Sequence, residues 1–183
     1  DLEVRALDRL AEAVVAQLLL LDAGHAAEGP DVALAVELLA QVFAALAAEG
    51  APEVARSFAT FLDQPGVPVV SVAVTCEAGK GQLTLAQRRY VPLGSPVSKS
   101  QLWQVPVTLR YGAGGKSATA KVLVDAATKS ADLAFCPDWV QANHGGFGYY
   151  VSQYSDRLLE QLSAVATTLP IAEQMALLDD TRF

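Results

Sequence analysis

Residues 61–70 read FLDQPGVPVV and separate two parts of the chain that differ in the period of their apolar residues. Before this stretch, apolar residues recur at three- and four-residue steps, as at Leu10, Val14 and Leu18, which is typical of one face of a helix. After it, apolar and polar or small residues alternate, as in VVSVAV at 69–74, which is typical of a half-buried strand. The central Pro-Gly pair predicts a turn, and the second proline favours an extended strand entry.

Helices are expected in the first part of the chain. The first ends at Asp22-Ala23-Gly24, and the second begins after Gly29-Pro30-Asp31 and stops at Glu49-Gly50, because proline favours helix starts and glycine favours helix ends. The third spans about residues 52–62. Its apolar side chains are expected to be buried, and they are Val54, Phe58, Phe61 and Leu62.

Short alternating runs bounded by turn residues follow from residue 67 to about residue 150. No helical pattern intervenes between them, so they predict an antiparallel β-sandwich and not a parallel sheet with crossover helices. Pro106 lies inside one run and indicates an edge or a bulge there. The stretch GAGGKS at 112–117 lacks the first glycine of a phosphate loop and precedes a strand-like run, so it favours a hairpin turn.

The end of the chain returns to a helical pattern. Ser155-Asp156 can cap one helix, and Pro170 can open another that continues through Leu178. Because the sequence stops inside this pattern, we expect that a longer natural sequence has been cut. The expected fold class is α+β, with N-terminal helices, then an antiparallel β-sandwich, then C-terminal helices. The expected domains are a helical segment at 1–64, the antiparallel β-sandwich domain at 65–153 and the helical start of a further domain at 154–183.

The charge and the apolar runs exclude some partners. The chain has 13 Lys and Arg against 20 Asp and Glu, without a basic run, so a nucleic-acid partner is not expected. The apolar run at 13–21 is much shorter than the roughly 20 residues of a membrane span and has no basic region before it, so neither a membrane anchor nor a signal peptide is expected.

The two cysteines, Cys76 and Cys136, lack the spacing of a zinc or redox motif. Two buried, unpaired cysteines are the preferred interpretation, and a disulfide is the alternative. A paired form would place the protein in a secreted or periplasmic setting, and an unpaired form in the cytoplasm.

Three stretches together resemble the aminopeptidase N family of zinc exopeptidases, which are gluzincins. The stretch at 61–70 looks like the family's Trp-x-x-Gln-Pro-Gly-aromatic-Pro-Val-Val at the exit from the catalytic domain. LTLAQRRY at 83–90 and LWQVPV at 102–107 resemble the sandwich strands Leu-x-Gln-x-Arg-Phe and Leu-Trp-x-Ile-Pro-Val. DWVQANHGGFGYY at 138–150 resembles the Trp-Val-x-x-Asn segment that leads into Gly-Tyr-Tyr-Arg.

The resemblance extends from about Gln41 to the end, where Leu177-Leu178-Asp179-Asp180 is similar to the start of the family's last domain. It is poor before Gln41. The chain departs from the family pattern at Phe61, where the family has Trp, at Val67, where it has an aromatic residue, and at Val151, where it has Arg.

The family's catalytic motifs are missing from this sequence. Zinc in these enzymes is held by His-Glu-x-x-His with a downstream Glu, and a Gly-x-Met-Glu-Asn loop binds the free amine of the substrate. The chain has only His25 and His144, neither followed by Glu, and its single methionine is Met175 in the sequence Gln-Met-Ala. Both histidines are expected to be solvated loop residues. No catalytic, cofactor-binding or metal-binding residue is therefore assigned, and zinc is implied only for a full-length parent.

The resemblance implies a non-catalytic fragment of an aminopeptidase N-like zinc metallopeptidase, whose parent removes N-terminal amino acids from peptides. The sandwich would act as a spacer between the catalytic and helical domains. Its partners would be the neighbouring domains of the parent, and peptide substrate would be reached only through the parent. A freestanding β-sandwich binding or adaptor module is the alternative. The aromatic residues Trp103, Trp139, Tyr149 and Tyr150 are expected to pack in the core or at interfaces, not to form an exposed platform.

Overall fold

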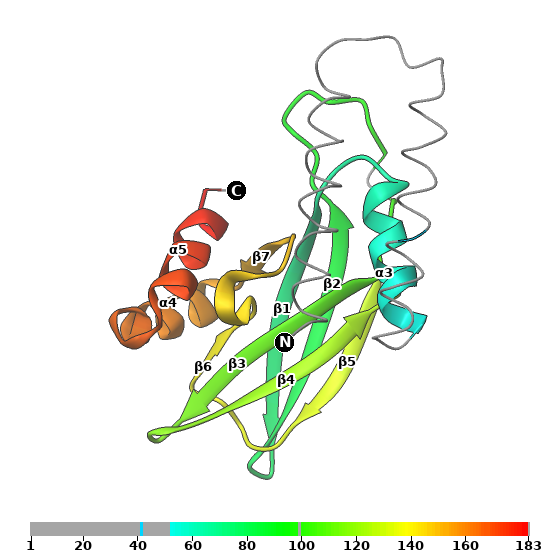
Figure 1. Ribbon diagram of the computed structural model, residues 1–183. Coiled ribbons are helices and arrows are strands. Elements are labelled where there is room, and N and C mark those ends of the chain that lie inside the picture. The colour runs from blue at the N-terminus through cyan, green and yellow to red at the C-terminus, as the bar shows by residue number, and fades with distance from the viewer. Residues whose placement is uncertain (1–40, 42–51, 99, 183) are drawn as a thin grey trace, which may run out of the picture. The chain divides into compact units, whose positions relative to one another are not determined.

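The computed structural model describes residue 41, residues 52–98 and residues 100–182 (Figure 1). The chain divides into two units, Asp1–Arg56 and Ser57–Phe183, and both sheets lie in the second unit. The predicted first helix and nearly all of the second lie outside the described residues. The third predicted helix is confirmed as α3, Pro52–Leu62.

Four strands form the first sheet, in the order β5-β2-β1-β7. They are β1 (Pro68–Glu77), β2 (Lys80–Arg89), β5 (Thr128–Leu133) and β7 (Val151–Tyr154). The β1–β2 hairpin pairs all ten residues of each strand, from Pro68 opposite Arg89 to Glu77 opposite Lys80. The sequence change at residues 61–70 therefore marks the entry into the first strand of the sheet.

The second sheet has three antiparallel strands in the order β4-β3-β6. They are β3 (Val105–Ala113), β4 (Lys116–Val124) and β6 (Trp139–Gln141). The GAGGKS stretch is the β3–β4 hairpin, with Gly114 and Gly115 at positive φ, so the predicted hairpin turn is confirmed. Strand β6 pairs only with Arg110–Gly112, which leaves Pro106 flanked by β4 alone, as an edge residue would be.

The two sheets enclose one core, and the predicted β-sandwich is confirmed. Alternate residues of each strand point inward, as the burial of Val70, Val72 and Val74 in β1 shows. The core also includes Leu83 and Leu85 from β2, Val105, Val107, Leu109 and Tyr111 from β3, Val122 and Val124 from β4, and the buried Trp103 before β3.

One part of the fold prediction is wrong, because the first sheet is mixed and not antiparallel. Strand β7 runs parallel to β1, with Val69 opposite Val151 and Val72 opposite Tyr154. The chain leaves the first sheet after β5, forms β6 in the second sheet and then returns to the edge of the first sheet. No tight hairpin joins β7 to β1, so nothing in the connection requires opposite directions.

The C-terminal helices are confirmed as α4 (Asp156–Val165) and α5 (Ile171–Asp180), which lie beside β6 and β7 (Figure 1). The predicted cap is present, since the Ser155 side chain accepts a hydrogen bond from the Leu158 amide. Two short 3-10 turns lie in this part of the chain. The first, η1 (His144–Gly146), precedes β7, and the second, η2 (Ala166–Thr168), lies between α4 and α5. Leu162, Leu169 and Leu177 form the core of this helical part.

The face of α3 that packs on the sandwich differs from the prediction. Ser57 is buried and Phe61 packs against the main core, whereas Phe58 and Leu62 are exposed. The Thr60 hydroxyl also faces the sandwich, because it accepts a hydrogen bond from the Gln104 amide at 3.1 Å. The side chain of Val54 lies outside the described residues. Local apolar spacing identified the helix but not which of its sides meets the sheets.

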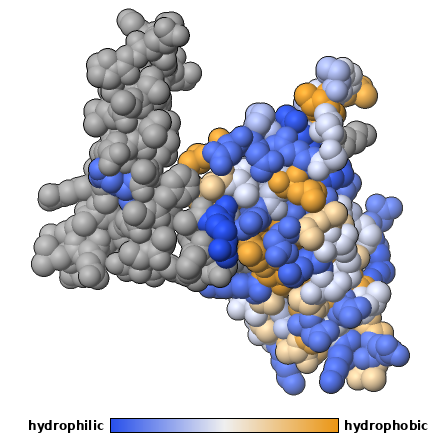
Figure 2. All heavy atoms as spheres, turned by 90° about the vertical axis from the view of Figure 1, so that its right-hand side faces the viewer, coloured by the Kyte–Doolittle hydropathy of each residue, from blue (hydrophilic) through white to orange (hydrophobic). Residues whose placement is uncertain are grey.

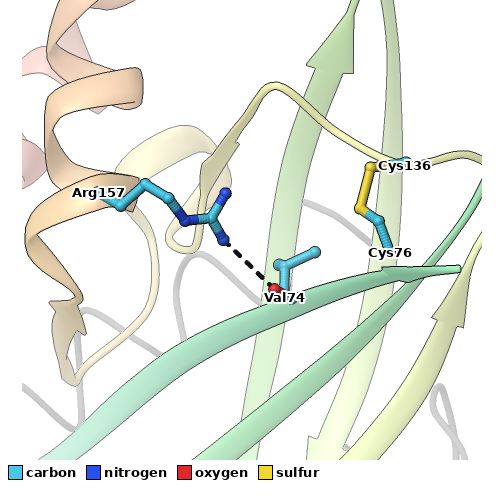
Figure 3. The surroundings of a disulfide bond; sticks show 4 residues. All are labelled: Val74, Cys76, Cys136 and Arg157. Atoms are coloured by element: carbon cyan, nitrogen blue, oxygen red, sulfur yellow. Dashed lines mark hydrogen bonds between the residues drawn. A yellow bond between two sulfur atoms is a disulfide. The ribbon is translucent and has the colours of Figure 1, made fainter.

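A disulfide joins Cys76, at the end of β1, to Cys136, in the loop between β5 and β6 (Figure 3). The strand register explains why they meet: Cys76 is opposite Gly81, and Gly81 is opposite Leu133, three residues before Cys136. The Cys136 amide also donates to the Gly79 carbonyl at 3.0 Å. The preferred interpretation of two unpaired cysteines is therefore wrong, and the alternative of a disulfide is the one observed.

Candidate functional site

The described residues contain no group of three or more His, Cys, Asp or Glu that could hold a metal ion. His25 lies outside this part of the chain, and Met175 is exposed on α5. None of the helices placed by the structure is long and apolar enough to cross a membrane. The features that remain as candidates are two buried polar clusters, one between the C-terminal helices and the sandwich and one inside the sandwich, and a small pocket.

The most extensive of these clusters surrounds Glu173 of α5 and includes Arg110, Gln141, His144 and Gly145, and is called the Glu173 cluster below. Glu173 is 0% exposed. Its Oε2 accepts from Arg110 Nη2 at 2.5 Å, and its Oε1 lies 2.6 Å from His144 Nδ1. The Gly145 amide donates to the same Oε1 at 3.2 Å, and Gln141 Nε2 donates to the Glu173 backbone carbonyl at 3.0 Å.

Four elements contribute to the cluster. Arg110 comes from β3, Gln141 from β6, His144 and Gly145 from η1, and Glu173 from α5. A carboxylate can only accept hydrogen bonds, so the His144 tautomer that fits is the one with its proton on Nδ1. The cluster therefore fixes α5 and the turn before β7 onto the second sheet.

His144 lies in the η1 turn with its side chain 35% exposed, but the sequence did not predict its contact with the buried Glu173 carboxylate. Sequence reasoning also missed Glu173. A signal was present: Glu173 and Leu177 are four residues apart in α5, which puts the glutamate on the same helical side as a buried leucine. The position of Arg110 across from it could not be read from local spacing.

The Glu173 cluster does not suit zinc. Both carboxylate oxygens are already used by Arg110, His144 and the Gly145 amide, and the positive charge of the Arg110 guanidinium beside Oε2 disfavours a metal ion there. The Arg110 guanidinium carbon also lies 5.8 Å from the centroid of the Trp139 ring, a cation–π geometry. The arrangement can hold elements together, and it offers no set of zinc ligands.

Two tyrosines extend the cluster toward β7. Tyr154 donates to Gln141 Oε1 at 2.7 Å and accepts from the Ala142 amide at 2.8 Å, while Tyr150 donates to the Ala142 carbonyl at 2.6 Å. Burial raises the pKa of both phenols far above the ordinary value of 10.0. They therefore stay protonated and serve as hydrogen-bond donors.

A second polar cluster lies inside the sandwich at Gln87 of β2. Its Nε2 donates to the carbonyls of Trp103, Val124 and Ala126 at 2.7, 3.0 and 3.0 Å, and its Oε1 accepts from the Trp103 amide at 2.9 Å. One buried amide thus satisfies backbone groups before β3 and at the end of β4. This role gives a physical reason for a glutamine at this position of LTLAQRRY.

The aromatic residues have different roles. Trp103 and Tyr150 are buried, and Trp139 packs against the helical core, so the packing role predicted for them is confirmed. Tyr149 is exposed, although its ring lies 6.1 Å from that of Phe61 in an edge-to-face arrangement. On the face of the molecule shown in Figure 2, apolar residues lie in separate spots between hydrophilic ones.

A small pocket of about 150 Å³ opens between β7, the last turn of α5 and the end of β2. Asp180 lies in its wall, and its Oδ1 accepts from the Ser152 amide at 2.8 Å. Burial raises the pKa of Asp180 from 3.8 to about 6, against the smaller lowering effect of its hydrogen bonds with Ser152. The pocket is lined by Val69, Arg88, Val151, Ser152, Leu159 and Asp180, among others.

Comparison with known proteins identifies aminopeptidases as relatives. The chain is 28% identical over 121 residues to puromycin-sensitive aminopeptidase from Caenorhabditis elegans, which covers 64% of this chain and 13% of that protein. It is 27% identical over 123 residues to aminopeptidase N from Lactobacillus delbrueckii subsp. lactis, which covers 67% of this chain and 14% of that protein. The relationship is aminopeptidase N-like.

The matched part of the chain thus spans about one seventh of the length of these curated relatives. No model of a known protein family matches the chain. The similarity agrees with the resemblance seen in the motifs of the sandwich. It does not assign a catalytic role to any residue that the structure describes.

Proposed function

We propose that this chain is a non-catalytic portion of an aminopeptidase N-like zinc metallopeptidase, in which the β-sandwich acts as a spacer between a catalytic and a helical domain. Similarity to two aminopeptidases over two thirds of the chain supports the proposal. The lack of His-Glu-x-x-His and Gly-x-Met-Glu-Asn in the sequence supports a non-catalytic role. Zinc and peptide substrate would be held by parts of the parent outside this chain.

The Glu173 cluster is the observation that carries the spacer role. A spacer that sets the distance between two domains must not bend where its own elements meet. Charge-assisted hydrogen bonds from Arg110 and His144 to a fully buried carboxylate fix α5 to the second sheet at that point. The disulfide adds a covalent link between the β1–β2 hairpin and the loop that leads into β6.

Exposed apolar residues on α5 support a role beside neighbouring domains. Ile171, Met175 and Leu178 are spaced by four and three residues, so they share one helical side, and their exposed fractions are between 60% and 76%. Phe147, next to η1, is 92% exposed. Because α5 also buries Leu177 on its opposite side, it is apolar on two sides, which is typical of a helix covered by a further partner.

The setting of the parent follows from the disulfide. A Cys76–Cys136 bond persists in oxidising surroundings, so the proposal places the parent in a secreted or periplasmic setting. The similarity to aminopeptidases does not favour the freestanding binding module.

Two measurements on the isolated chain test the non-catalytic role. Zinc content is measured by metal analysis, and hydrolysis is measured with aminoacyl chromogenic substrates. We expect no stoichiometric zinc and no hydrolysis. Stoichiometric zinc together with hydrolysis by the isolated chain would reject the proposal.

A chimera tests the spacer role. The segment of the Caenorhabditis elegans puromycin-sensitive aminopeptidase that aligns with this chain is replaced by the corresponding residues of the chain. We expect the chimera to hydrolyse aminoacyl substrates, and Glu173→Gln in the inserted segment to lower its activity while the exposed-site control Glu160→Gln does not. A folded, zinc-loaded chimera without activity would contradict the spacer role.

A further inference from the structure

We propose that the outer edge of β4 is a docking site for an extended, acidic segment of another polypeptide, which pairs with β4 as a further strand of the second sheet. The inference is independent of the proposed function. Strand β4 lies at the edge of this sheet, with β3 as its hydrogen-bonded neighbour (Figure 1). No strand among the described residues pairs with its other side. An exposed strand edge is the surface that strand addition uses.

The hairpin between β3 and β4 fixes which backbone groups of β4 point outward. Both glycines of its two-residue turn are at positive φ, so the residues that flank the turn form a hydrogen-bonded pair. From there on, every second residue of β4 bonds to β3. The amides and carbonyls of Ser117, Thr119 and Lys121 therefore point away from β3, and the described part of the chain supplies no backbone partner for them.

Two of the other sheet edges are already occupied. Beside β6, the Ala142 amide donates to the Tyr154 hydroxyl, and on β7 the Ser152 amide donates to Asp180. The edges at β4 and β5 remain, and β4 is the longer strand, with nine residues against six. Strand β4 therefore offers the longer row of outward backbone groups.

The charge of this edge selects the class of partner. The whole chain has 13 Lys and Arg against 20 Asp and Glu, yet β4 contains Lys116 and Lys121 and no acidic residue. Both lysines are exposed, and neither forms an ion pair with another described residue. Edge lysines oppose pairing with neutral or basic strands, whereas an acidic residue directly opposite a lysine stabilises the pairing.

A second copy of the chain suits this edge less well. If two β4 strands paired about a two-fold axis, the four lysines of the two copies would lie along one short shared edge. Like charges there would repel each other. An acidic segment neutralises the lysines, so we assign the edge to a segment of that kind.

The core side of β4 sets the second requirement on the partner. Ala118 and Ala120 are only partly buried, although both pack against the core. An added strand would lie beside these alanines, and apolar side chains at alternate positions would cover them. The expected segment therefore alternates apolar and polar residues and has two acidic residues five positions apart, one opposite each lysine.

The test uses the whole chain and two peptides with blocked ends. The acidic peptide is Thr-Val-Glu-Val-Thr-Val-Thr-Glu, and the basic control has lysine in place of both glutamates. In antiparallel register, the acidic peptide places valine opposite Val122, Ala120 and Ala118, and glutamate opposite Lys121 and Lys116. Each peptide is titrated at low ionic strength and neutral pH while NMR follows the amide signals of the chain and their hydrogen exchange.

We expect saturable binding of the acidic peptide only. Amide exchange should become slower at Thr119 and Lys121, which gain a partner, and stay unchanged at Ala120, which already bonds to β3. Binding without this protection would be ordinary charge attraction and would overturn the proposal, as would equal affinity for the two peptides. Self-association of the chain that protects the same amides would also overturn it, because a second copy would then be the occupant.

Variants of two residues separate the backbone contribution from the charge. Thr119→Pro removes an outward N–H without removing a bond to β3, and we expect it to abolish binding, whereas the control Thr119→Val should keep the affinity within about twofold. Lys121→Glu leaves the backbone intact, and should weaken the acidic peptide and strengthen the basic one, each about tenfold. Unchanged binding of the acidic peptide by Lys121→Glu, or by a folded Thr119→Pro, would overturn the proposal.

Discussion

At the scale of single residues, buried polar side chains decide how the two sheets and the C-terminal helices meet. Gln87 is the clearest case, because an amide can donate to carbonyls and accept from an amide at the same time. A carboxylate could not donate, and an aliphatic side chain could do neither. The position therefore needs glutamine for chemical reasons and not only for its size.

Replacing Gln87 by leucine should strongly destabilise the sandwich. The change leaves the Trp103 amide and the carbonyls of Trp103 and Val124 without their side-chain partner inside the core. We expect Gln87→Leu to lower the free energy of unfolding by about 3 kcal/mol, measured by urea denaturation. Gln82→Leu, at an exposed position of the same strand, should change it by less than about 0.5 kcal/mol. Equal effects of the two variants would contradict the role of Gln87.

Asp180 should make stability depend on pH. Burial raises the pKa of this carboxyl from 3.8 to about 6, so the folded state holds the proton more tightly than the unfolded state. The contribution of Asp180 is therefore most favourable below about pH 4 and is lost as the pH rises through about 6. We expect Asp180→Asn to remove this dependence and to raise the free energy of unfolding at pH 7 by about 1–2 kcal/mol after allowance for solvent screening.

The measurement is urea denaturation of the natural chain and Asp180→Asn at intervals between pH 4 and pH 7. The difference between the two curves isolates Asp180 from the other titrating groups, because both proteins share them. A difference that stays constant across this range would show that the carboxyl is not perturbed in the folded state.

At the scale of elements, side-chain contacts hold α5 against the rest of the protein, because a helix uses its backbone hydrogen bonds internally. It contacts η1 and β7, and the Glu173 cluster connects it to β3 and β6 as well. The parallel strand β7 is fixed from the same helix, since Asp180 accepts from the Ser152 amide on β7. Loss of one buried carboxylate should therefore loosen a whole helix.

Glu173→Gln tests this expectation. The glutamine side chain has nearly the same shape, but it loses the charge that pairs with Arg110 and His144. Because Arg110 and His144 are partly exposed, we expect a loss of about 2–3 kcal/mol, less than for a fully buried pair. Hydrogen exchange should become faster in α5 while the amides of the β1–β2 hairpin stay protected.

Glu160→Gln is the matched control, because Glu160 is an exposed glutamate on α4. It should leave hydrogen exchange in α5 unchanged. If both variants behaved alike, the Glu173 cluster would not be what holds the helix.

At the scale of the whole molecule, the disulfide links segments that are 60 residues apart. It joins the first sheet to the loop that crosses to the second, and Arg157 of α4 donates to the Val74 carbonyl two residues before Cys76 (Figure 3). The end of β1 is therefore a point where the first sheet, the crossing loop and α4 all meet.

Removing the disulfide should lower the stability of the protein. The disulfide closes a loop between residues 60 positions apart and so reduces the conformational freedom of the unfolded chain. We therefore expect Cys76→Ser combined with Cys136→Ser to lower the free energy of unfolding, measured by urea denaturation, by about 2–4 kcal/mol. Dithiothreitol should destabilise the natural chain by a similar amount and should not affect the double variant. A natural chain whose midpoint is insensitive to reduction would contradict this expectation.

The sequence by itself determined the features that depend only on residues near one another in the chain. The period of the apolar residues located α3, the main strands, α4 and α5, and glycine at residues 114 and 115 located the β3–β4 hairpin. The lack of a zinc-binding motif could likewise be read without a structure. The domain boundaries at residues 64 and 153 remain predictions.

Only the tertiary structure decided which distant segments meet. The pairing of Cys76 with Cys136, the parallel direction of β7 and the contact of Glu173 with Arg110 all join residues from different elements. A periodic pattern records which side of an element is apolar, but it contains no information about the partner or the direction of that partner. For the same reason, the pattern in α3 predicted buried positions for Phe58 and Leu62, which the packed fold leaves exposed.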